Sequence, residues 1–479
     1  MMSPTTRWRA HSLLAVIFAF SSSSPSCCWL TLSFAFTPSP PPSWEQLRST
    51  LPDLFNKSPA PVYYDRLPDD YHLDNNNALL PILYRDKECI CAASETVWLA
   101  LECKNVNYIT VLVSIGDDKK DDTCRKPIPR IVWPDDKDSD DEDSSDGNGG
   151  DAIQLLEQIQ NRYPNNPPNF YPKSLSAAVD VVRCNILRLP GVMPRYSDPE
   201  FMSLAPYIFK EDGSLVQQSS HCVTLEEIEE MQEEYYLGKF LCGRELTAAD
   251  IVWAPYLERY AIQLPLIFSN AKRCNPRTSY EEVNAWYTAM ETKVPAYACR
   301  VQGDARHWRK CLERVLPLHN ARAASDDERI MSLPPVPKKF GWWMTKNNLS
   351  REGREELWKE YATESRPWLA DTPGREVALY FIRNCEEIVS AATLSSSGMD
   401  LQQSDVDEAL REIVQILLDS KMTDSKLSEC SDDDDEPQIL LSDNARRLAR
   451  FACERIEVPR DMGMIPVLSL GELIQSFTQ

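Results

Sequence analysis

The sequence predicts an α/β domain, followed by an all-helical domain and a helical C-terminal extension. Two short apolar runs, PILYR at 81–85 and YITVLVS at 108–114, are typical of buried strands, and a helical pattern, SETVWLALECK, lies between them at 94–104. Strand, helix and strand at this spacing indicate a right-handed βαβ unit. From about residue 172 onward, helical patterns dominate and no long β-type run interrupts them.

The remaining elements follow in chain order. A brief strand, IVW at 131–133, and a helix, AIQLLEQIQNRY at 152–163, come after the βαβ unit. Helical patterns then cover 174–189, 224–241, 247–264 and 279–293. These helices supply the second domain of the predicted fold.

The stretch GRELTAADI at 243–251 predicts a helix start. Thr247 is placed to cap the helix, and Asp250, three residues later, is placed to accept a hydrogen bond from the backbone N–H of Thr247. Leu246 and Ile251 can pack across the cap. This capping box has a structural interpretation only, because it begins a helix without supplying chemistry.

A polar, proline-bearing connection at 321–370 leads to the extension. There the apolar residues recur at i, i+3, i+4 and i+7, which predicts buried helix faces. These residues are Val406, Ala409, Leu410, Ile413, Val414, Leu417 and Leu418, and then Ala445, Leu448, Ala449, Ala452 and Ile456. We expect a targeting segment at 1–36, a Pro-rich linker with a short helix at 37–78, the α/β domain at 79–165, the helical domain at 172–325, a linker at 326–370, and the helical extension with an acidic loop at 371–479.

Charge excludes one class of partner. The formal net charge is −22, and nucleic acid is not expected as a partner because phosphate binding requires clustered Lys and Arg. Nine acidic residues fall within 135–151, and DDDDE occupies 432–436. Both runs are interpreted as solvated loops and not as cation sites.

The N-terminus has the layout of a cleavable signal sequence, because Arg7, Arg9 and His11 precede an apolar stretch. A membrane anchor is the alternative interpretation. SFAFTPSP, around Phe36, resembles the bipartite plastid-targeting junction of algae with secondary plastids. We therefore expect a plastid location, with the secretory pathway or endoplasmic reticulum as the alternative.

The chain has fifteen cysteines, which are scattered without framework spacing. Two lie in the expected signal, and the remaining thirteen are interpreted mostly as buried free thiols. Free thiols favour a reducing compartment. Cys89 and Cys91 lack a second Cys/His pair, so no metal site is predicted.

Several of these pieces together resemble the glutathione transferase family, and more closely its cysteine-type classes, omega, lambda and dehydroascorbate-reductase-like. The stretches are LYRDKECICAASETVWLALE (83–102), KPIPRIVWPD (126–135), GRELTAADIVWAPYLER (243–259) and AWYTAMETKVPAY (285–297). The resemblance covers roughly 79–310. It implies a thioredoxin-like N-terminal domain, an all-α glutathione-transferase-like C-terminal domain, and glutathione as co-substrate without a metal.

Alignment on VWLALE places Cys91 first and Ser94 last in the active-site motif, which here is CAAS. The resemblance implies that Cys91 is the nucleophile. A thiol at a helix N-terminus meets unsatisfied N–H groups and the positive end of the macrodipole, so we expect a lowered pKa. Ser94 offers a hydroxyl donor and no resolving thiol, so chemistry would proceed through a mixed disulfide with glutathione.

The binding side departs from the family. The resemblance implies a cis bond at Ile128–Pro129, with the backbone of Ile128 turned toward the cysteinyl part of glutathione. Gly149 and Gly150 stand where the family has a Glu/Gln-Ser pair for the γ-glutamyl carboxylate. Glycines keep the backbone N–H donors but remove the side-chain groups, and the acidic run beside them disfavours an anionic ligand.

Two hypotheses remain. The first is a glutathione-dependent thiol transferase that acts on a small electrophilic or disulfide substrate, with a homodimer as an open alternative to a monomer. The second is a non-catalytic binding or scaffold protein whose glutathione site has decayed. His307, in DARHWRKC, is expected to pack in the core rather than to join the active site.

Overall fold

The computed structural model describes thirteen segments of the chain. They are 40–55, 62–64, 80–114, 128–134, 151–185, 218–235, 238–268, 275–323, 332–344, 349–363, 365–394, 401–419 and 441–476. The expected targeting segment, most of the acidic run at 135–151, the run at 432–436, and Gly149 and Gly150 lie outside these residues. The predictions made for those residues remain predictions.

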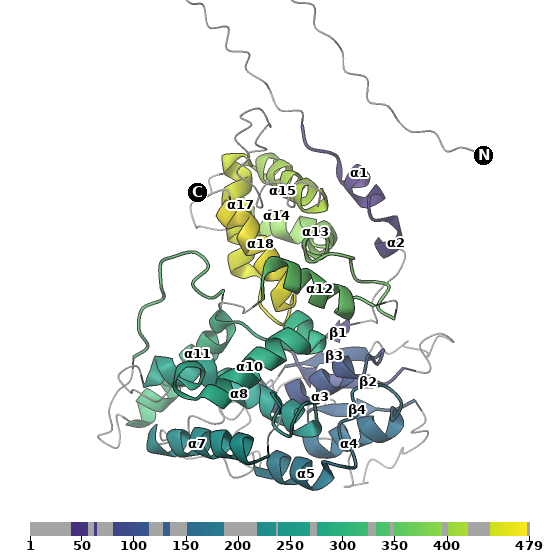
Figure 1. Ribbon diagram of the computed structural model, residues 1–479. Coiled ribbons are helices and arrows are strands. Elements are labelled where there is room, and N and C mark those ends of the chain that lie inside the picture. The colour runs from purple at the N-terminus through teal and green to yellow at the C-terminus, as the bar shows by residue number, and fades with distance from the viewer. Residues whose placement is uncertain are drawn as a thin grey trace, which may run out of the picture. The chain divides into compact units, whose positions relative to one another are not determined.

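A small mixed sheet is built around the predicted βαβ unit (Figure 1). Strands β2 (Ile82–Asp86) and β3 (Ile109–Val113) pair in parallel, with helix α3 (Ala92–Cys103) between them in the chain. Strand β4 (Arg130–Val132) is antiparallel to β2. The short strand β1 (Val62–Tyr64), which the sequence pattern did not predict, adds to β3 in parallel and gives the order β1-β3-β2-β4.

The two faces of the sheet bury different side chains. Leu83 points to the face that packs with α3 and with α4 (Ala152–Arg162), where it joins the largest core. Ile82 and Tyr84 belong to a separate apolar cluster, together with Val111 of β3. This alternation follows from the two-residue period of a strand. It determines which residues of β2 can reach the start of α3.

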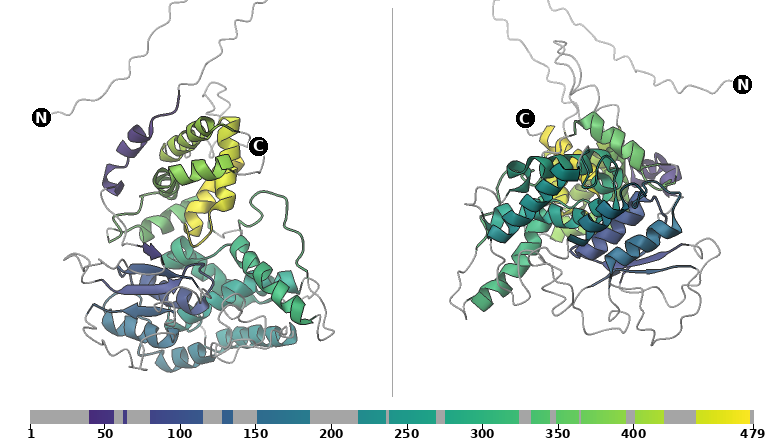
Figure 2. Two further views of the ribbon diagram at one scale, coloured as in Figure 1. Left: turned by 180° about the vertical axis from the view of Figure 1, so that it is seen from behind. Right: turned by 60° about the horizontal axis from the view of Figure 1, so that its bottom comes forward.

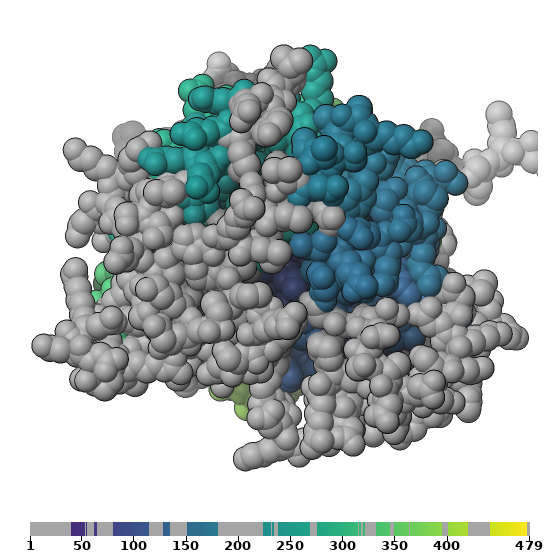
Figure 3. Space-filling view, turned by 90° about the horizontal axis from the view of Figure 1, so that it is seen from below, coloured from purple at the N-terminus to yellow at the C-terminus, as the bar shows by residue number. Residues whose placement is uncertain are grey.

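The second part of the chain is helical. It contains α5 (Ser176–Asn185), α7 (Gln218–Tyr235), α8 (Ala248–Ile267), α9 (Pro276–Ser279), α10 (Glu281–Lys293), the π-helix η3 (Tyr297–Val301) and α11 (Ala305–Ala323). Trp253 and Trp286 are buried here, and this core is continuous with that of α3. From below, atoms in the colour of the β2–α3–β3 segment appear between the α4–α5 surface and the helical part (Figure 3).

The predicted C-terminal end of the helix at 224–241 is wrong. Helix α7 stops at Tyr235, and Phe240 and Gly243 form an isolated bridge in the loop that follows. The reason is Asp250, whose buried carboxylate accepts the N–H of Leu241 at 2.8 Å, so this loop must turn back toward α8. The same carboxylate accepts the N–H of Thr247 at 2.8 Å, which confirms the hydrogen bond between Thr247 and Asp250 that the predicted capping box contains.

The extension is a helical cluster with its own core (Figure 2). It consists of α12 (Arg351–Tyr361), α13 (Pro373–Arg383), α14 (Cys385–Leu394), α15 (Gln403–Leu418), α17 (Asp443–Arg455) and α18 (Met464–Ser476). The residues predicted to form its apolar faces are buried, apart from Leu418, which is partly buried. Helix α12 lies inside the stretch read as a linker; it buries Trp358 and Tyr361 within an otherwise polar sequence.

The N-terminal piece joins the extension. Helix α1 (Trp44–Ser49) is followed by α2 (Pro52–Phe55), and Leu47 and Leu51 are buried in the core of the extension. The indole N–H of Trp44 donates to Asp407 of α15 at 2.8 Å. Across the segments that the structure describes, no helix is both long enough and apolar enough to cross a membrane.

Candidate functional site

Cys91 stands immediately before α3, as the sequence predicted. Its backbone is extended, and its carbonyl accepts the N–H of Glu95 at 3.0 Å, which closes the first helical turn. The Cys91 side chain is partly exposed, whereas Cys89 and Ala92 on either side are buried. Cys91 is therefore the thiol at the start of α3 that another molecule can approach.

Asp86, at the end of β2, organises the turn before Cys91. Its buried carboxylate accepts the N–H groups of Glu88 at 2.9 Å, Ile90 at 2.5 Å and Cys91 at 2.9 Å. Backbone N–H groups at a helix start are the donors that would otherwise stabilise an anion. Here the carboxylate of Asp86 already accepts three N–H groups, that of Cys91 at the N-cap and those of Glu88 and Ile90 before it.

The expected lowering of the Cys91 pKa is wrong. Burial raises the pKa of the Cys91 thiol, and the negative charge of Asp86 raises it further. A hydrogen bond from Ser94 and the charge of Arg259 oppose that rise, but they do not reverse it. Two anions would have to share one helix N-terminus, so the thiol form is favoured.

Ser94 and Cys91 are brought together as predicted. Ser94 is buried in the first turn of α3, and its hydroxyl accepts the N–H of Asp86 at 3.4 Å. The hydroxyl also hydrogen-bonds the Cys91 sulfur and favours its thiolate form. This is the one side-chain donor of the motif that acts directly on the nucleophile.

Arg259 of α8 is a functional residue that sequence reasoning missed. The guanidinium is fully buried, donates to the carbonyl of Ile90 at 2.9 Å and pairs with Glu95 at 2.8 Å. It also lies over the ring of Trp308 at 4.0 Å. A charged pair in the middle of an apolar helix, Glu258-Arg259 within PYLER, is the signal that could have identified it.

Glu258 and Glu95 share the region around this one guanidinium. Glu258 accepts the indole N–H of Trp308 at 2.8 Å and the hydroxyl of Tyr297 at 3.0 Å. Burial raises the pKa of both carboxyls. Repulsion by the charge of Glu95 raises the pKa of Glu258 further, whereas a hydrogen bond with Glu258 lowers the pKa of Glu95. One proton shared between the two carboxyls removes this repulsion.

His307 packs, as expected, and does not reach the Cys91 sulfur. Its side chain is buried, its ring lies edge-on to Trp308, and Nε2 is 3.3 Å from the carbonyl oxygen of Cys89. Burial and the charge of Arg259 lower the pKa of His307 to about 3. The neutral imidazole therefore donates from Nε2 and holds the turn that carries Cys91.

Cys89 has a structural environment. Its sulfur is buried and accepts a hydrogen bond from Nη1 of Arg85 at 2.9 Å, and burial raises the pKa of the thiol. Both Cys89 and Cys91 are free thiols. Arg85 is thus directed at Cys89 and not at the predicted nucleophile, and Lys87 lies near the ring of Tyr64.

The Ile128–Pro129 bond is cis, as expected. Ile128 packs on the sheet face of Ile82 and Tyr84, and no described residue is hydrogen-bonded to its backbone. Tyr84, on the same face, therefore does not face α3. Gly149 and Gly150 fall outside the described residues, so the γ-glutamyl side of the site stays a prediction. Within the described ranges, no three His, Cys, Asp or Glu residues are placed to hold a metal ion.

The known proteins that resemble this chain do so in their three-dimensional structures. No protein-family model matches the chain, and no curated protein matches it. A glutathione transferase omega 3C from Trametes versicolor is similar over 50% of this chain and 91% of its own, at 18% identity and a TM-score of 0.34.

Two further solved structures give the same picture. A glutathione transferase homolog from Drosophila mojavensis with bound glutathione matches 49% of this chain and 96% of its own, at 17% identity and a TM-score of 0.35. A tau-class glutathione S-transferase from mango matches 49% of this chain and 98% of its own, at 14% identity and a TM-score of 0.36. At these values the likeness does not establish the family of this chain.

Proposed function

We propose that the protein is a glutathione-dependent thiol transferase in which Cys91 forms a mixed disulfide with glutathione. The observation that supports this most is the position of Cys91, a partly exposed thiol at the start of α3 with the hydroxyl of Ser94 directed at its sulfur. The proposal also rests on the CAAS motif and on the cis bond before Pro129.

The proposed reaction has two balanced exchanges. In the first, the Cys91 thiolate attacks the glutathionyl sulfur of a disulfide R–S–S–G, so that a Cys91–glutathione disulfide forms and the thiolate RS⁻ leaves. In the second, a glutathione thiolate attacks the glutathionyl sulfur of that disulfide. Oxidised glutathione leaves, and the Cys91 thiolate is regenerated. Ser94 supplies a hydrogen bond to Cys91 as attacking and as leaving sulfur.

The raised pKa of Cys91 sets the condition for this chemistry. Because burial and the negative charge of Asp86 raise the pKa of Cys91, only a small part of this thiol is ionised at neutral pH. The leaving of Cys91 in the second exchange is slowed for the same reason. We therefore expect a slow transferase whose rate rises with pH.

A second candidate function is binding without catalysis. One observation favours it: the thiol is kept protonated by the charge of Asp86 and by burial, which is the reverse of what a cysteine nucleophile needs. A chain that uses this fold only to hold a ligand or partner would tolerate such a thiol.

The two candidates are separated by glutathionylation followed by mass spectrometry. The full chain is incubated with oxidised glutathione at pH 8, digested, and mapped. The proposal expects one glutathionyl group on Cys91, released by reduced glutathione, and its loss in Cys91→Ser. Cys103→Ser, which removes another partly exposed thiol, is the matched control and should leave the adduct on Cys91.

The thiol transferase is refuted if Cys91 stays unmodified while Cys103 reacts, or if the adduct on Cys91 is not released by reduced glutathione. The first result leaves the binding function in place, because the thiol then has no exchange chemistry.

A further inference from the structure

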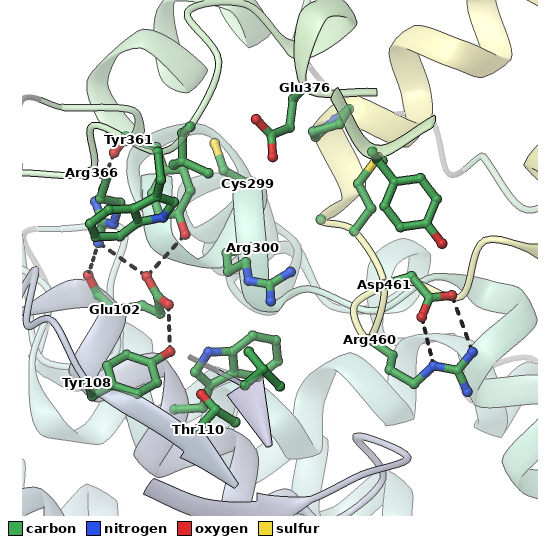
Figure 4. A pocket seen from close by; sticks show the side chains of 18 of the residues that line it. Glu102, Tyr108, Thr110, Cys299, Arg300, Tyr361, Arg366, Glu376, Arg460 and Asp461 are labelled. Carbon is green, nitrogen blue, oxygen red and sulfur yellow. Dashed lines mark hydrogen bonds and ion pairs between the residues drawn. The ribbon is translucent and has the colours of Figure 1, made fainter. Parts of the chain in front are cut away.

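A cavity of about 390 Å³ is lined by Trp98 and Glu102 of α3, and Cys91 is not among its lining residues. It is bordered by the edge of the sheet at β1 and β3, by α3 and η3, and by parts of the extension around α12, α13 and the loop before α18 (Figure 4). Cavities of this size hold small organic molecules. The extension therefore closes off a space that the first two parts of the chain would leave open.

Aromatic side chains form much of the wall. They are Trp98, Trp358, Trp368, Tyr108, Tyr361 and Tyr380. On one side of the wall two backbone segments are in close contact, because a Cβ at Gly463 would lie only 1.6 Å from the carbonyl oxygen of Cys299. A glycine is therefore required where the loop before α18 meets η3. The residue next to Cys299 is Arg300, and this contact fixes where its backbone lies.

Of the eight charged residues that line the cavity, four form two ion pairs, while Arg85 donates to the sulfur of Cys89 at 2.9 Å and Arg383 to the carbonyl oxygen of Leu54 at 3.1 Å. Arg366 binds Glu102 at 3.2 Å, and Arg460 binds Asp461 at 2.9 Å. Figure 4 shows both pairs at the margins of the cavity. These ion pairs build the wall and leave no charge for a ligand.

Arg300 is different. Its guanidinium lies 5.1 Å from the centre of the Trp98 ring, and Nη1 is 3.4 Å from the carbonyl oxygen of Pro459. Among the described residues, no carboxylate forms an ion pair with Arg300. Arg300 is partly buried, and a guanidinium with most of its five donors unused is a binding group for an anion.

Glu376 of α13 borders the same open space from the other side (Figure 4). One of its oxygens, Oε2, accepts the N–H of Ala370 at 2.8 Å. The described part of the chain provides no cation within ion-pair distance of this carboxylate. Arg300 and Glu376 thus present opposite charges to one cavity without binding each other. Both residues are partly buried, and a ligand that carries both opposite charges would give each side chain a partner of opposite charge.

We propose that this cavity binds a small zwitterion, an α-amino acid with an apolar or aromatic side chain. Its carboxylate is bound by Arg300, its ammonium group by Glu376, and its side chain by the aromatic wall. The site is separate from Cys91 and does not depend on the proposed thiol chemistry. Its place between the sheet and the extension makes the ligand a contact between the two.

The test uses the full chain and three probes that differ by one group each: L-phenylalanine, 3-phenylpropanoate, which lacks the ammonium group, and 2-phenylethylamine, which lacks the carboxylate. Binding is followed by intrinsic tryptophan fluorescence, because Trp98, Trp358 and Trp368 line the cavity. Calorimetry gives the dissociation constants. The variants are Arg300→Gln and Glu376→Gln, each with a matched control on the exposed face of α12, Lys359→Gln and Glu360→Gln.

We expect L-phenylalanine to bind at least tenfold more tightly than either analogue, since each loses one charge-assisted hydrogen-bonded group. Arg300→Gln should weaken L-phenylalanine about tenfold or more and leave 2-phenylethylamine unchanged. Glu376→Gln should likewise weaken L-phenylalanine about tenfold or more, but it should leave the binding of 3-phenylpropanoate unchanged. Neither control variant should alter binding. If Arg300→Gln does not fold, Arg300→Lys keeps the charge and should weaken binding less, because the ammonium group lacks the planar fork of the guanidinium.

The proposal is overturned if L-phenylalanine shows no saturable binding at millimolar concentration. It is also overturned if 3-phenylpropanoate binds as tightly as L-phenylalanine, which would reduce the site to one for simple anions. If L-phenylalanine binds Arg300→Gln as tightly as wild type, its binding site lies elsewhere, and this result also excludes the cavity.

Discussion

The two ends of helix α3 are satisfied in different ways. At its start, Asp86 lies five residues before Cys91 and accepts the N–H groups of the preceding turn. At its end, Arg366 of the extension donates to the carbonyl oxygen of Glu102 at 2.9 Å and to its side chain at 3.2 Å. Both ends of a helix leave unpaired backbone groups, which need partners. The start has a local partner, whereas the end combines local donors, such as the N–H of Asn105, with a donor 264 positions along the chain.

The comparison shows that charge at the two ends has opposite consequences. The anion at the start stabilises the turn but competes with the thiolate that the site needs. The cation at the end offsets Glu102, an acidic residue placed unfavourably in the last turn of the helix. The extension is therefore part of how α3 is held, and the first two parts of the chain are not independent of it.

Removing the distant partner should have the largest effect. Arg366→Met leaves Glu102, whose side chain is only 10% exposed, without its cation and removes one of the donors to the carbonyl oxygen of Glu102. We expect a loss of about 3 kcal/mol in the free energy of unfolding, measured by urea denaturation. The double variant Glu102→Gln, Arg366→Met should recover part of this loss, because no unpaired charge remains.

The control for that prediction is Arg375→Met, which breaks an ion pair with Asp371, whose side chain is 64% exposed. It should change stability by no more than about 0.5 kcal/mol. If Arg366→Met is as mild as this control, the extension does not secure the end of α3.

A pH dependence is expected near the start of α3. The pKa of His307 is about 3 when folded, below its ordinary value near 6.5, so the unfolded chain takes up the proton first as pH falls. The contribution of His307 to stability is thus complete above pH 6.5 and is lost progressively toward pH 3. Between pH 7 and pH 5, wild type should lose about 2 kcal/mol more than His307→Gln. Urea titrations at both pH values measure this difference, and parallel pH profiles would contradict a neutral buried imidazole.

A smaller effect is expected from the local partner. Asp86→Asn removes the negative charge beside Cys91, so the pKa of the thiol should fall and alkylation by iodoacetamide at pH 7 should accelerate by up to about tenfold. Stability should fall by about 1 kcal/mol, because an amide accepts fewer of the three N–H groups. Glu88→Gln, in the same turn, is the matched control. An unchanged alkylation rate would show that burial alone keeps Cys91 protonated.

Local patterns explain what could be predicted from the sequence. The strands around LYRD, the helix after Cys91 and the capping box at Thr247 each depend on residues within a few positions, and the structure contains them. The apolar faces of the extension follow from a 3.6-residue period, as Val406 and Leu448 illustrate.

What could not be predicted depends on long-range pairing. The approach of Arg259 to Ile90 and that of Arg366 to Glu102 join residues more than 150 positions apart, which no local period records. The direction of the Cys91 pKa was missed because the helix N-terminus was considered without the burial of the thiol and without the carboxylate of Asp86 beside it. Helix α12 was missed because its buried aromatics are few and its remaining residues are polar.

The packing of α1 against the extension has a consequence for synthesis. Trp44 binds Asp407, and Arg411 donates to the carbonyl oxygens of Pro41 and Pro42 at 3.1 Å. A ribosome makes α1 more than 350 residues before it makes these partners. Leu47 and Leu51 must therefore remain uncovered until α15 has emerged from the ribosome, so this core is completed long after α1 has been made.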